Sequence, residues 1–563
     1  MKVIIVGGVA GGATAAARIR RLNEHAEITV FERSGYISYA NCGLPYYIGD
    51  VITDPEELTL QTPESFFKRF RINMKIHHEV ISIHPERKTV SVKNLENGEI
   101  FEEKYDKLIL SPGAKPTQPR LPGVGMDKLF TLRTVEDTFR IKEYINKNHP
   151  KSAVLAGGGF IGLELAENLR ELGMDVTIVQ RPKQLMNPFD PDMASMIHNE
   201  MRKHGIKLVL GYTVEGFKEK DNGVEVLLKD NPSLQADMVV LAIGVTPDTV
   251  LAKEAGLELG IKESIVVNDR METSVPDIYA AGDAVQVKHY VTGNDALISL
   301  AGPANKQGRI IADNICGGDS RYLGSQGSSV IKVFDMTAAT TGINETNAKK
   351  SGLEVDTVIL SPMSHAGYYP GGKVMTMKVV FEKESYRLLG TQIIGYEGVD
   401  KRIDVLATAI HAGLNATQLK DLDLAYAPPY SSAKDPVNMA GFMIDNIAKG
   451  TLKQWHLEDM DKISKDKDVV LIDVRTVCEF SRGHIDGFKN IPVDELRERI
   501  SEIEKGKAVY LICQSGLRSY IASRILEGNG YETYNFSGGF RFYDAVVNDR
   551  ALIERAYACG MDY

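Results

Sequence analysis

The chain is poor in cysteine and has no long apolar run. Its 563 residues include five cysteines and a single tryptophan. An odd, widely scattered set of thiols argues against a secreted disulfide framework and predicts a reducing, cytoplasmic setting. No apolar stretch approaches the length of a membrane-spanning helix, and the chain runs from Met1 straight into a strand-like segment without a signal-peptide pattern, so we expect a soluble protein.

A large excess of charge of one sign is also lacking. The chain has 66 basic and 75 acidic residues, which gives a formal net charge of -9. This balance creates no general attraction to nucleic acid or to an anionic membrane, and we expect neither as a partner. No group of cysteines and histidines has the spacing of metal ligands, so no metal is expected. The length corresponds to roughly three to five domains.

The first segment has the order of a strand, a glycine-rich turn and a helix. In the turn Gly7–Gly12, Gly7 and Gly12 take the first and third places of G-x-G-x-x-G, whereas Val9 holds the middle one. Glu32 ends the next apolar run, where a carboxylate can accept both hydroxyls of an adenosine ribose. An open helix N-terminus there would hold a pyrophosphate, and the alternative is a tight turn without a ligand.

A second glycine turn follows a later apolar run. Gly157, Gly159 and Gly162 stand at the standard spacing, so the sequence predicts a second dinucleotide site. Gln180 ends the following apolar run in place of an acid, and Arg181 comes next. A neutral amide can bond a ribose hydroxyl without repelling a 2'-phosphate, which Arg181 could also meet, so NADH and NADPH both stay open.

Six motifs together resemble the flavoprotein pyridine nucleotide-disulfide reductases. They are Gly7–Gly12, Glu32, Ser111–Ala114, Gly157–Gly162, Ala242–Pro247 and Ala280–Asp283. The resemblance covers residues 1 to about 440 and implies FAD on the first nucleotide fold, NADH or NADPH on the second, and a dimerisation domain after them. The cofactor-binding residues it implies are Gly7, Gly12, Glu32, Arg33, Val80, Ser111, Gly113, Gly157, Gly159, Gly162, Gln180, Gly244, Gly282, Asp283 and Ala301.

One lone cysteine stands just downstream of the first turn. Cys42 lies in the run Ser38–Tyr46 and has no CxxC partner, so it can cycle with a small-molecule thiol but cannot form an internal CxxC disulfide. The run resembles the single-cysteine branch of the family, most closely the coenzyme A-disulfide reductases, which implies that Cys42 forms a mixed disulfide with coenzyme A. Related NADH oxidases and peroxidases use a cysteine sulfenic acid, so the cysteine alone does not decide the substrate.

Two tyrosines favour the coenzyme A branch. Tyr426, in the run Asp423–Ser431, resembles the tyrosine that reaches into the partner subunit's active site, which implies a homodimer. Tyr368 resembles a second such tyrosine, with Tyr369 as an adjacent rival. A phenol can donate a proton or bond to sulfur, whereas the alternative is an aromatic packed at a subunit contact.

Coenzyme A carries phosphates, so a site that binds it needs cationic side chains. The resemblance favours one set of substrate-binding residues, and the alternative for any of the arginines is a solvated helix face. The set is Thr14, Arg18, Arg21, Ser38, Asn41 and Lys434.

Beyond Gly450 a strand and helix pattern begins again. An apolar run ends at Cys513, and Cys-x-x-Gly-x-Arg-Ser leads into a helix. Such a turn can direct several N–H groups at one sulfur and stabilise a persulfide anion. The segment resembles a rhodanese domain, which implies that Cys513 carries sulfane sulfur and that Arg518 helps to shape the loop, although similar loops serve phosphatases and inactive regulatory modules. We expect Asp473, Arg475 and His484 to be scaffold residues, and Cys316, Cys478 and Cys559 to be structural or incidental.

These patterns predict an α/β chain with two Rossmann-like domains, an α+β dimerisation domain and a C-terminal α/β rhodanese domain. The expected boundaries are 1–115 with 250–325 for FAD, 116–249 for NAD(P)H, 326–450 for dimerisation and 451–563 for rhodanese. We predict an NAD(P)H-dependent persulfide or polysulfide reductase in which Cys513 passes sulfane sulfur toward Cys42. The alternatives are a coenzyme A-disulfide reductase with an independent sulfurtransferase, a peroxide or oxygen reductase, and a redox-sensing flavin-binding protein.

Overall fold

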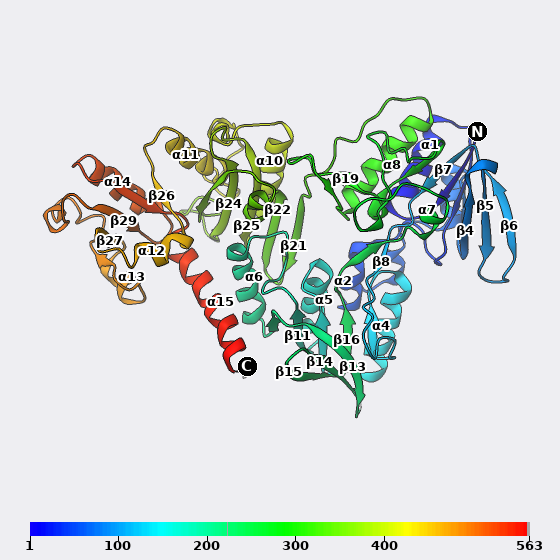
Figure 1. Cartoon of the computed structure of the whole chain (residues 1–563), viewed down its shortest axis with the longest axis horizontal. Helices are drawn as coiled ribbons and strands as arrows, with labels where there is room; N and C mark the ends of the chain where they lie inside the picture. The colour runs from blue at the N-terminus through cyan, green and yellow to red at the C-terminus, as the bar shows by residue number, and fades with distance from the viewer. Residues whose placement is uncertain (222, 560–563) are drawn as a thin grey trace. The chain divides into compact units, whose positions relative to one another are not determined.

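The computed structural model describes residues 1–221 and 223–559, with side chains as far as residue 555. The chain forms two compact units (Figure 1). The first contains Met1–Lys183 and Gly205–Gly327, and the second contains Gln184–His204 and the chain from Ser328 onward. Their sheets and helices confirm the predicted α/β fold class.

The first unit opens with a parallel, doubly wound sheet. Its strand order is β18 (Ile278–Ala280), β7 (Lys107–Leu110), β1 (Lys2–Val6), β2 (Glu27–Phe31) and β3 (Asn73–Lys75). Val3, Ile4 and Ile5 are fully buried, as expected for a central strand whose two faces are covered. The helix α1 (Ala10–Leu22) packs against α8 (Ala301–Ile315). The strand order reverses beside β1, and such a switch point places ligands at the carboxyl ends of the strands.

A second parallel sheet in the same unit repeats this plan. Its order is β12 (Lys207–Leu210), β11 (Asp175–Gln180), β10 (Ser152–Ala156), β16 (Met238–Leu241) and β9 (Leu129–Thr131). The helix α5 (Phe160–Glu171) follows β10, and α4 (Val135–Asn148) follows β9. The unit also contains the shorter helices α2 (Leu44–Ile48), α3 (Pro63–Phe70) and α7 (Val250–Glu254). One three-stranded antiparallel sheet consists of β4 (His78–His84), β5 (Thr89–Asn94) and β6 (Ile100–Lys104). A second consists of β13 (Val214–Lys220), β14 (Gly223–Leu228) and β15 (Asn231–Ala236).

The second unit contains a five-stranded antiparallel sheet. Its order is β21 (Ser329–Val333), β22 (Met336–Gly342), β25 (Leu388–Gly395), β24 (Met375–Glu382) and β23 (Val355–Leu360), and the helices α9 (Glu345–Lys350), α10 (Val399–His411) and α11 (Pro436–Ala448) accompany it. The helix α6 (Pro191–Lys203) belongs to this unit because buried polar bonds hold its N-terminal end. Lys378 on β24 lies 2.7 Å from Asp192 and 3.3 Å from Asp190.

A smaller parallel sheet completes the second unit. Its order is β26 (Gln454–Trp455), β30 (Thr533–Phe536), β29 (Ala508–Ile512), β27 (Val469–Asp473) and β28 (Lys489–Asn490). Trp455 is buried against Phe536, with ring centroids 4.4 Å apart. The helices of this part of the chain are α12 (Met460–Ile463), α13 (Val477–Ser481), α14 (Leu517–Glu527) and α15 (Gly539–Cys559), of which α14 packs against β29 and β30.

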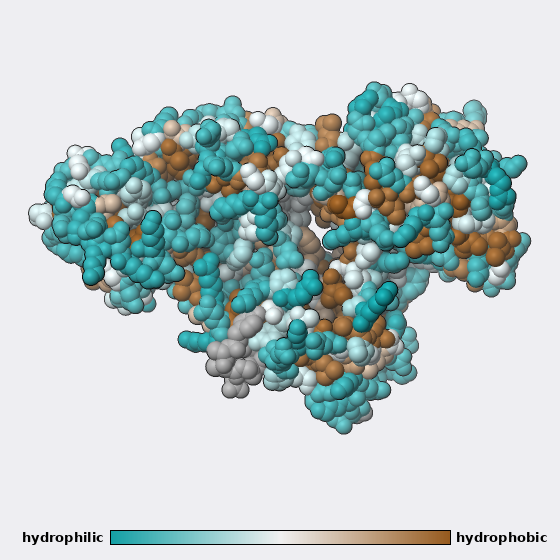
Figure 2. Space-filling view, in the orientation of Figure 1, coloured by the Kyte–Doolittle hydropathy of each residue, from teal (hydrophilic) through white to brown (hydrophobic). Residues whose placement is uncertain are grey.

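Hydrophilic residues cover much of the face shown in Figure 2. In the part of the chain that the structure describes, we find no helix with the length and apolar character needed to cross a bilayer.

Candidate active site

The first glycine turn is shaped for close backbone contact. Gly7 has φ of +96°, and a Cβ there would lie 2.1 Å from the Ser111 carbonyl oxygen. A Cβ at Gly12 would lie 1.9 Å from the Gly7 oxygen. Only glycine therefore lets α1 start this close to β1. Val9, at the N-cap of α1, makes no side-chain capping bond, so this helix end keeps the open amides that a pyrophosphate requires.

Glu32 and Asp283, the two predicted acidic cofactor ligands, lie just after strands of the first parallel sheet. Glu32 directly follows β2, is 9% exposed and accepts hydrogen bonds from the amides of Gly8 and Ser34, both at 2.9 Å. Asp283 follows β18 and pairs with Arg133 at 2.7 Å. Sequence reasoning missed Arg133, because no local motif marks an arginine whose partner lies 150 residues away.

The other residues expected at the first dinucleotide lie in the same unit. Arg33 pairs with Asp248 at 2.9 Å, and the amide of Gly282 donates to Gln307 at 2.7 Å. Val80 is buried in the hydrophobic core beside the sheet. Ser111 and Gly113 follow β7, and Ala301 starts α8, which has no side-chain cap. The glycine cradle, the acid and two open helix ends fit a dinucleotide such as FAD.

The second glycine turn has the same geometry. A Cβ at Gly157 would lie 2.2 Å from the Ala242 oxygen, and one at Gly162 would lie 2.1 Å from the Gly157 oxygen. Gly159 has open space around its Cβ position and caps α5 without a side-chain bond. Gln180 accepts a hydrogen bond from the amide of Gly158 at 3.0 Å, so it supports the turn as Glu32 does in the first fold. Gly244, in the loop after β16, has φ of +113° and open space around it.

Cys42 is exposed in a single helical turn, Asn41–Gly43, directly before α2. Partial shielding from water raises the pKa of the Cys42 thiol, and the charges of Glu164 and Asp283 raise it further, whereas Arg133 opposes them. The Asn41 side-chain amide is oriented to bond two groups of Arg133: it donates to the Arg133 carbonyl at 3.0 Å and accepts from the Arg133 guanidinium at 2.9 Å. Arg133 therefore links the cysteine segment to Asp283.

A second carboxylate near the cysteine was not predicted. Glu164 lies on α5 and accepts a hydrogen bond from the Tyr46 hydroxyl at 3.4 Å. Burial raises the pKa of Glu164 to about 7. Glu164 can therefore change its charge close to neutral pH, beside a thiol whose ionisation responds to that charge.

The residues expected to bind coenzyme A lie in both units. In the first unit, Thr14 donates to Asn305 at 2.6 Å, and Arg18 pairs with Asp313 at 2.8 Å. Arg21 is exposed on α1, and the amide of Ser38 donates to the Gly8 oxygen at 2.9 Å. In the second unit, Lys434 is exposed.

The two predicted tyrosines meet in the second unit. The hydroxyls of Tyr368 and Tyr426 lie 2.5 Å apart, although the side chains are 75% and 45% exposed. The hydrogen bond to Tyr368 raises the pKa of Tyr426. Tyr369 instead packs edge-on against the buried His365, with centroids 5.6 Å apart. Tyr368 is therefore the one of the two adjacent tyrosines that bonds to Tyr426.

Cys513 lies at the end of β29 and is fully buried. Its sulfur accepts hydrogen bonds from the Gly516 amide at 3.1 Å and from the Ser519 hydroxyl at 3.2 Å. Arg518 makes a paired contact with Glu479 at 2.6 and 2.7 Å, which lowers the pKa of Glu479 to about 2. The arginine thus ties the loop to α13, and the sulfur receives one amide and one hydroxyl.

Other polar residues of this domain have scaffold contacts. Asp473 and Arg475 form a buried pair at 2.7 Å, and His484 stacks on Phe480 at 4.0 Å. Cys478 is exposed and Cys316 is half-buried, whereas the Cys559 side chain lies outside the described residues. Among the described residues, no group of three or more histidine, cysteine or acidic side chains could hold a metal ion.

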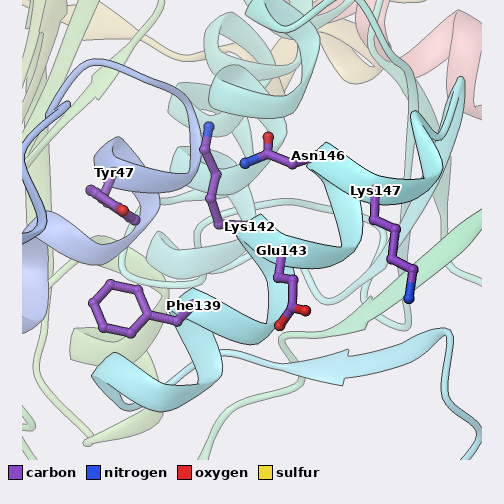
Figure 3. Close-up of a pocket in the computed structure, with 6 residues that line it drawn as sticks. All are labelled: Tyr47, Phe139, Lys142, Glu143, Asn146 and Lys147. Carbon is purple, nitrogen blue, oxygen red and sulfur yellow. The ribbon is translucent and has the colours of Figure 1, made fainter.

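Figure 3 shows a surface hollow of about 510 Å³ between α2 and α4. Tyr47 packs there against Phe139, with centroids 5.7 Å apart. Lys142 binds the end of α2, where it donates hydrogen bonds to the Ile48 oxygen at 2.9 Å and to Asp50 at 2.6 Å. None of the predicted site residues lines this hollow, so we assign it no part in the chemistry.

Three family descriptions match the chain in succession. "Pyridine nucleotide-disulphide oxidoreductase" matches residues 1–308, its dimerisation domain matches residues 328–436, and "Rhodanese-like domain" matches residues 456–545. The coenzyme A disulfide reductase of Staphylococcus aureus strain JH9 is 38% identical over 442 residues, which are 78% of this chain and 99% of that protein.

Two solved structures match almost the full length. Reduced Bacillus anthracis CoADR-RHD is 49% identical, with a TM-score of 0.95 over 98% of each chain. A NAD-dependent persulfide reductase from A. fulgidus is 38% identical, with a TM-score of 0.90 over 96% of this chain and all of that one. The chain therefore belongs to the pyridine nucleotide-disulphide oxidoreductases, a family of flavoenzymes, as a fusion of the coenzyme A disulfide reductase type with a rhodanese-like domain.

Proposed function

We propose that this flavoprotein reduces persulfides or polysulfides, including coenzyme A persulfide, with NADH or NADPH, and releases hydrosulfide. The observation that carries the proposal is the presence of two different thiol sites on one chain. Cys42 is exposed in the unit that also contains both glycine turns, whereas Cys513 is buried with hydrogen-bond donors on its sulfur. The first thiol is built to exchange with a small molecule, and the second is built to hold a sulfur anion.

The reaction at Cys42 balances as a thiol exchange followed by a reduction. The Cys42 thiolate attacks the inner sulfur of coenzyme A persulfide, the sulfur–sulfur bond breaks, and hydrosulfide leaves. Cys42 is then joined to coenzyme A in a mixed disulfide. This disulfide would return to the Cys42 thiolate and free coenzyme A by taking up two electrons and one proton, and FAD bound in the first nucleotide fold and reduced by NADH or NADPH would supply the electrons.

The chain's own groups have separate roles in this scheme. Arg133 opposes the two carboxylates that raise the pKa of Cys42, and it fixes the neighbouring Asn41. The bonded hydroxyls of Tyr368 and Tyr426 would hydrogen-bond to the substrate sulfur from the partner subunit of a homodimer. Thr14, Arg18, Arg21, Ser38, Asn41 and Lys434 would bind coenzyme A.

The proposal also assigns work to four domains. Residues 1–115 with 250–325 would bind FAD, and residues 116–249 would bind the nicotinamide dinucleotide. Residues 326–450 would form the dimer, and residues 451–563 would carry sulfane sulfur on Cys513.

A second candidate is a coenzyme A disulfide reductase with an independent sulfurtransferase. It is favoured by the Staphylococcus aureus relative, since 99% of that protein aligns with only 78% of this chain. In this case the flavin half would work without the rhodanese-like domain.

Anaerobic stopped-flow reoxidation of the NADH-reduced holoenzyme separates the two. Polysulfide, coenzyme A persulfide and coenzyme A disulfide would be compared in wild type, Cys513→Ser and Cys42→Ser, with Cys478→Ser as a control at an exposed cysteine of the same domain. We expect coenzyme A persulfide or polysulfide to reoxidise the enzyme fastest, and Cys513→Ser to slow reoxidation by polysulfide, whose sulfane sulfur Cys513 would carry, about tenfold or more. Preference for the disulfide, with no effect of Cys513→Ser, would establish the second candidate.

A further inference from the structure

One buried arginine ties together the two loops that carry Tyr368 and Tyr426. Neither tyrosine lies in a helix or strand, and both are exposed, so the bond between their hydroxyls needs support from elsewhere. Arg402 on α10 is 1% exposed. Its Nη2 donates to the Ser364 oxygen at 2.9 Å in one loop, and to the Tyr430 oxygen at 3.3 Å in the other.

Further contacts lock this arrangement. Arg402 Nη2 also lies 3.1 Å from the Ser431 hydroxyl, and Asp435 lies 3.0 Å from Nη2 and accepts a hydrogen bond from Nε at 3.2 Å. Ser431 donates to Asp435 at 2.7 Å, and its carbonyl accepts from the Ala366 amide at 3.0 Å, which joins the two loops directly. The neighbouring Lys401 donates to the Ala425 oxygen at 3.3 Å, one residue before Tyr426. Every contact lies within the second unit.

Asp435 keeps the charge that this network needs. Burial opposes its ionisation, but bonds from Ser431, from the Val437 amide and from Arg402 outweigh it and lower the pKa of Asp435. Asp435 also caps α11, since it accepts from the Val437 amide at 3.0 Å. The pair of loops is therefore anchored on two helices, α10 and α11.

We propose that Arg402 is a positioning residue for the reduction, which holds both loops so that Tyr368 and Tyr426 present their hydroxyls as one bonded pair. This rests on the proposed function, since it requires that the pair act on the substrate sulfur. A planar guanidinium can serve carbonyls on two loops and a carboxylate at once, whereas a lysine ammonium at this place could keep the charge pair but not the whole fork.

Replacing Arg402 would also destabilise the fold if its role were only structural, because breaking a buried charge pair lowers the free energy of unfolding. A double-mutant cycle distinguishes the two roles. If Arg402 acts through the tyrosines, its replacement loses its effect once the Tyr426 hydroxyl is gone. If it only stabilises the fold, the loss is the same with and without that hydroxyl.

The experiment uses the FAD-loaded protein with NADH and coenzyme A disulfide, in Arg402→Lys, Tyr426→Phe and the double variant. We expect Arg402→Lys to lower kcat about tenfold in the presence of Tyr426 and less than twofold in the Tyr426→Phe background. Flavin reduction by NADH should stay unchanged in all of them. Equal losses in both backgrounds, or wild-type rates in Arg402→Lys, would overturn the proposal.

Two further variants keep the outcome decisive. Arg475→Lys is the matched control, because Arg475 is also buried and paired with an aspartate, but in the rhodanese-like scaffold. It should lower the melting temperature without changing disulfide reduction. If Arg402→Lys does not fold, Ser431→Ala replaces it, with an expected loss of about threefold that also vanishes beside Tyr426→Phe. A Tyr426→Phe variant with full activity would instead refute the tyrosine role in the proposed function.

Discussion

At the scale of single residues, Cys42 is influenced by more acidic than basic side chains. Burial raises the pKa of its thiol most, Glu164 and Asp283 raise it further, and Arg133 opposes them. Glu164 is the variable member of this group, since its own pKa is raised to about 7 by burial. Around neutral pH its charge therefore contributes to how much of Cys42 is thiolate, the form that attacks a sulfur–sulfur bond.

Replacing Glu164 by glutamine should make Cys42 more reactive above pH 7. The substitution removes a negative charge that raises the pKa of Cys42, so the thiolate fraction rises. We expect iodoacetamide to alkylate Cys42 about two- to fivefold faster at about pH 8, as followed by mass spectrometry of the Cys42 peptide. Well below pH 7, where Glu164 is protonated in the wild type, the two rates should converge. Glu143→Gln, at an exposed site on α4, is the control, and a rate ratio that does not change with pH would contradict the argument.

At the scale of elements, β23 is an edge strand whose free side meets the rhodanese-like domain. The Ile359 amide donates to the Ser537 hydroxyl at 3.1 Å, and Gln454 donates to the Thr357 oxygen at 2.7 Å. Beside them, His456 lies 3.2 Å from Asp356. These side chains cover backbone groups that would otherwise form an open sheet edge.

The contact at β23 should weaken as pH rises. Burial lowers the pKa of His456, but the bond to Asp356 outweighs it, so the pKa in the folded protein is raised. The stabilisation is therefore complete below the unfolded value of about 6.5 and is lost as pH rises through the folded value. Hydrogen exchange at β23 and β26, corrected for the intrinsic rate, should show less protection at high pH. His456→Gln should remove this pH dependence, and a variant that keeps it would refute the assignment.

The sequence alone predicts those features of the site that one local segment determines. The glycine turns, Glu32 and the Cys513 loop were predictable because a strand, a turn and a helix fix their spacing locally. Arg133 was not, since Asp283 is 150 residues away. Gln180 was predicted as a ribose ligand, yet its amide also accepts from the Gly158 backbone. Arg402 could not be found either, because its acceptors lie on loops that come together only in the folded unit.

At the scale of the whole molecule, the last helix returns to a helix from the middle of the chain. Within the second unit, α15 packs against α6, as Figure 1 shows. Asp549 on α15 is buried, and it pairs with His198 at 2.8 Å and with Arg202 at 2.5 Å. The Leu185 amide donates to His198 Nε2 at 3.0 Å, so Nδ1 carries the hydrogen that Asp549 accepts. Long-range polar contacts thus hold the domain that contains Cys513 within its unit.

Replacing Asp549 by asparagine should release this helix. The substitution leaves Arg202 and His198 without their carboxylate, and loss of one partner from a buried charge pair costs roughly 3 kcal/mol. We expect hydrogen exchange in α15 and α6 to accelerate by about a hundredfold or more, because protection follows the free energy of local opening. Asp544→Asn, at an exposed position on the same helix, is the control and should exchange as the wild type does.

Coenzyme A disulfide reduction at Cys42 should persist in both variants, whereas reduction that depends on Cys513 should fall only in Asp549→Asn. Equal exchange in the two variants would show that the buried pair does not hold the domain, and an unchanged Cys513-dependent rate despite faster exchange would show that sulfur transfer does not require the docked helix.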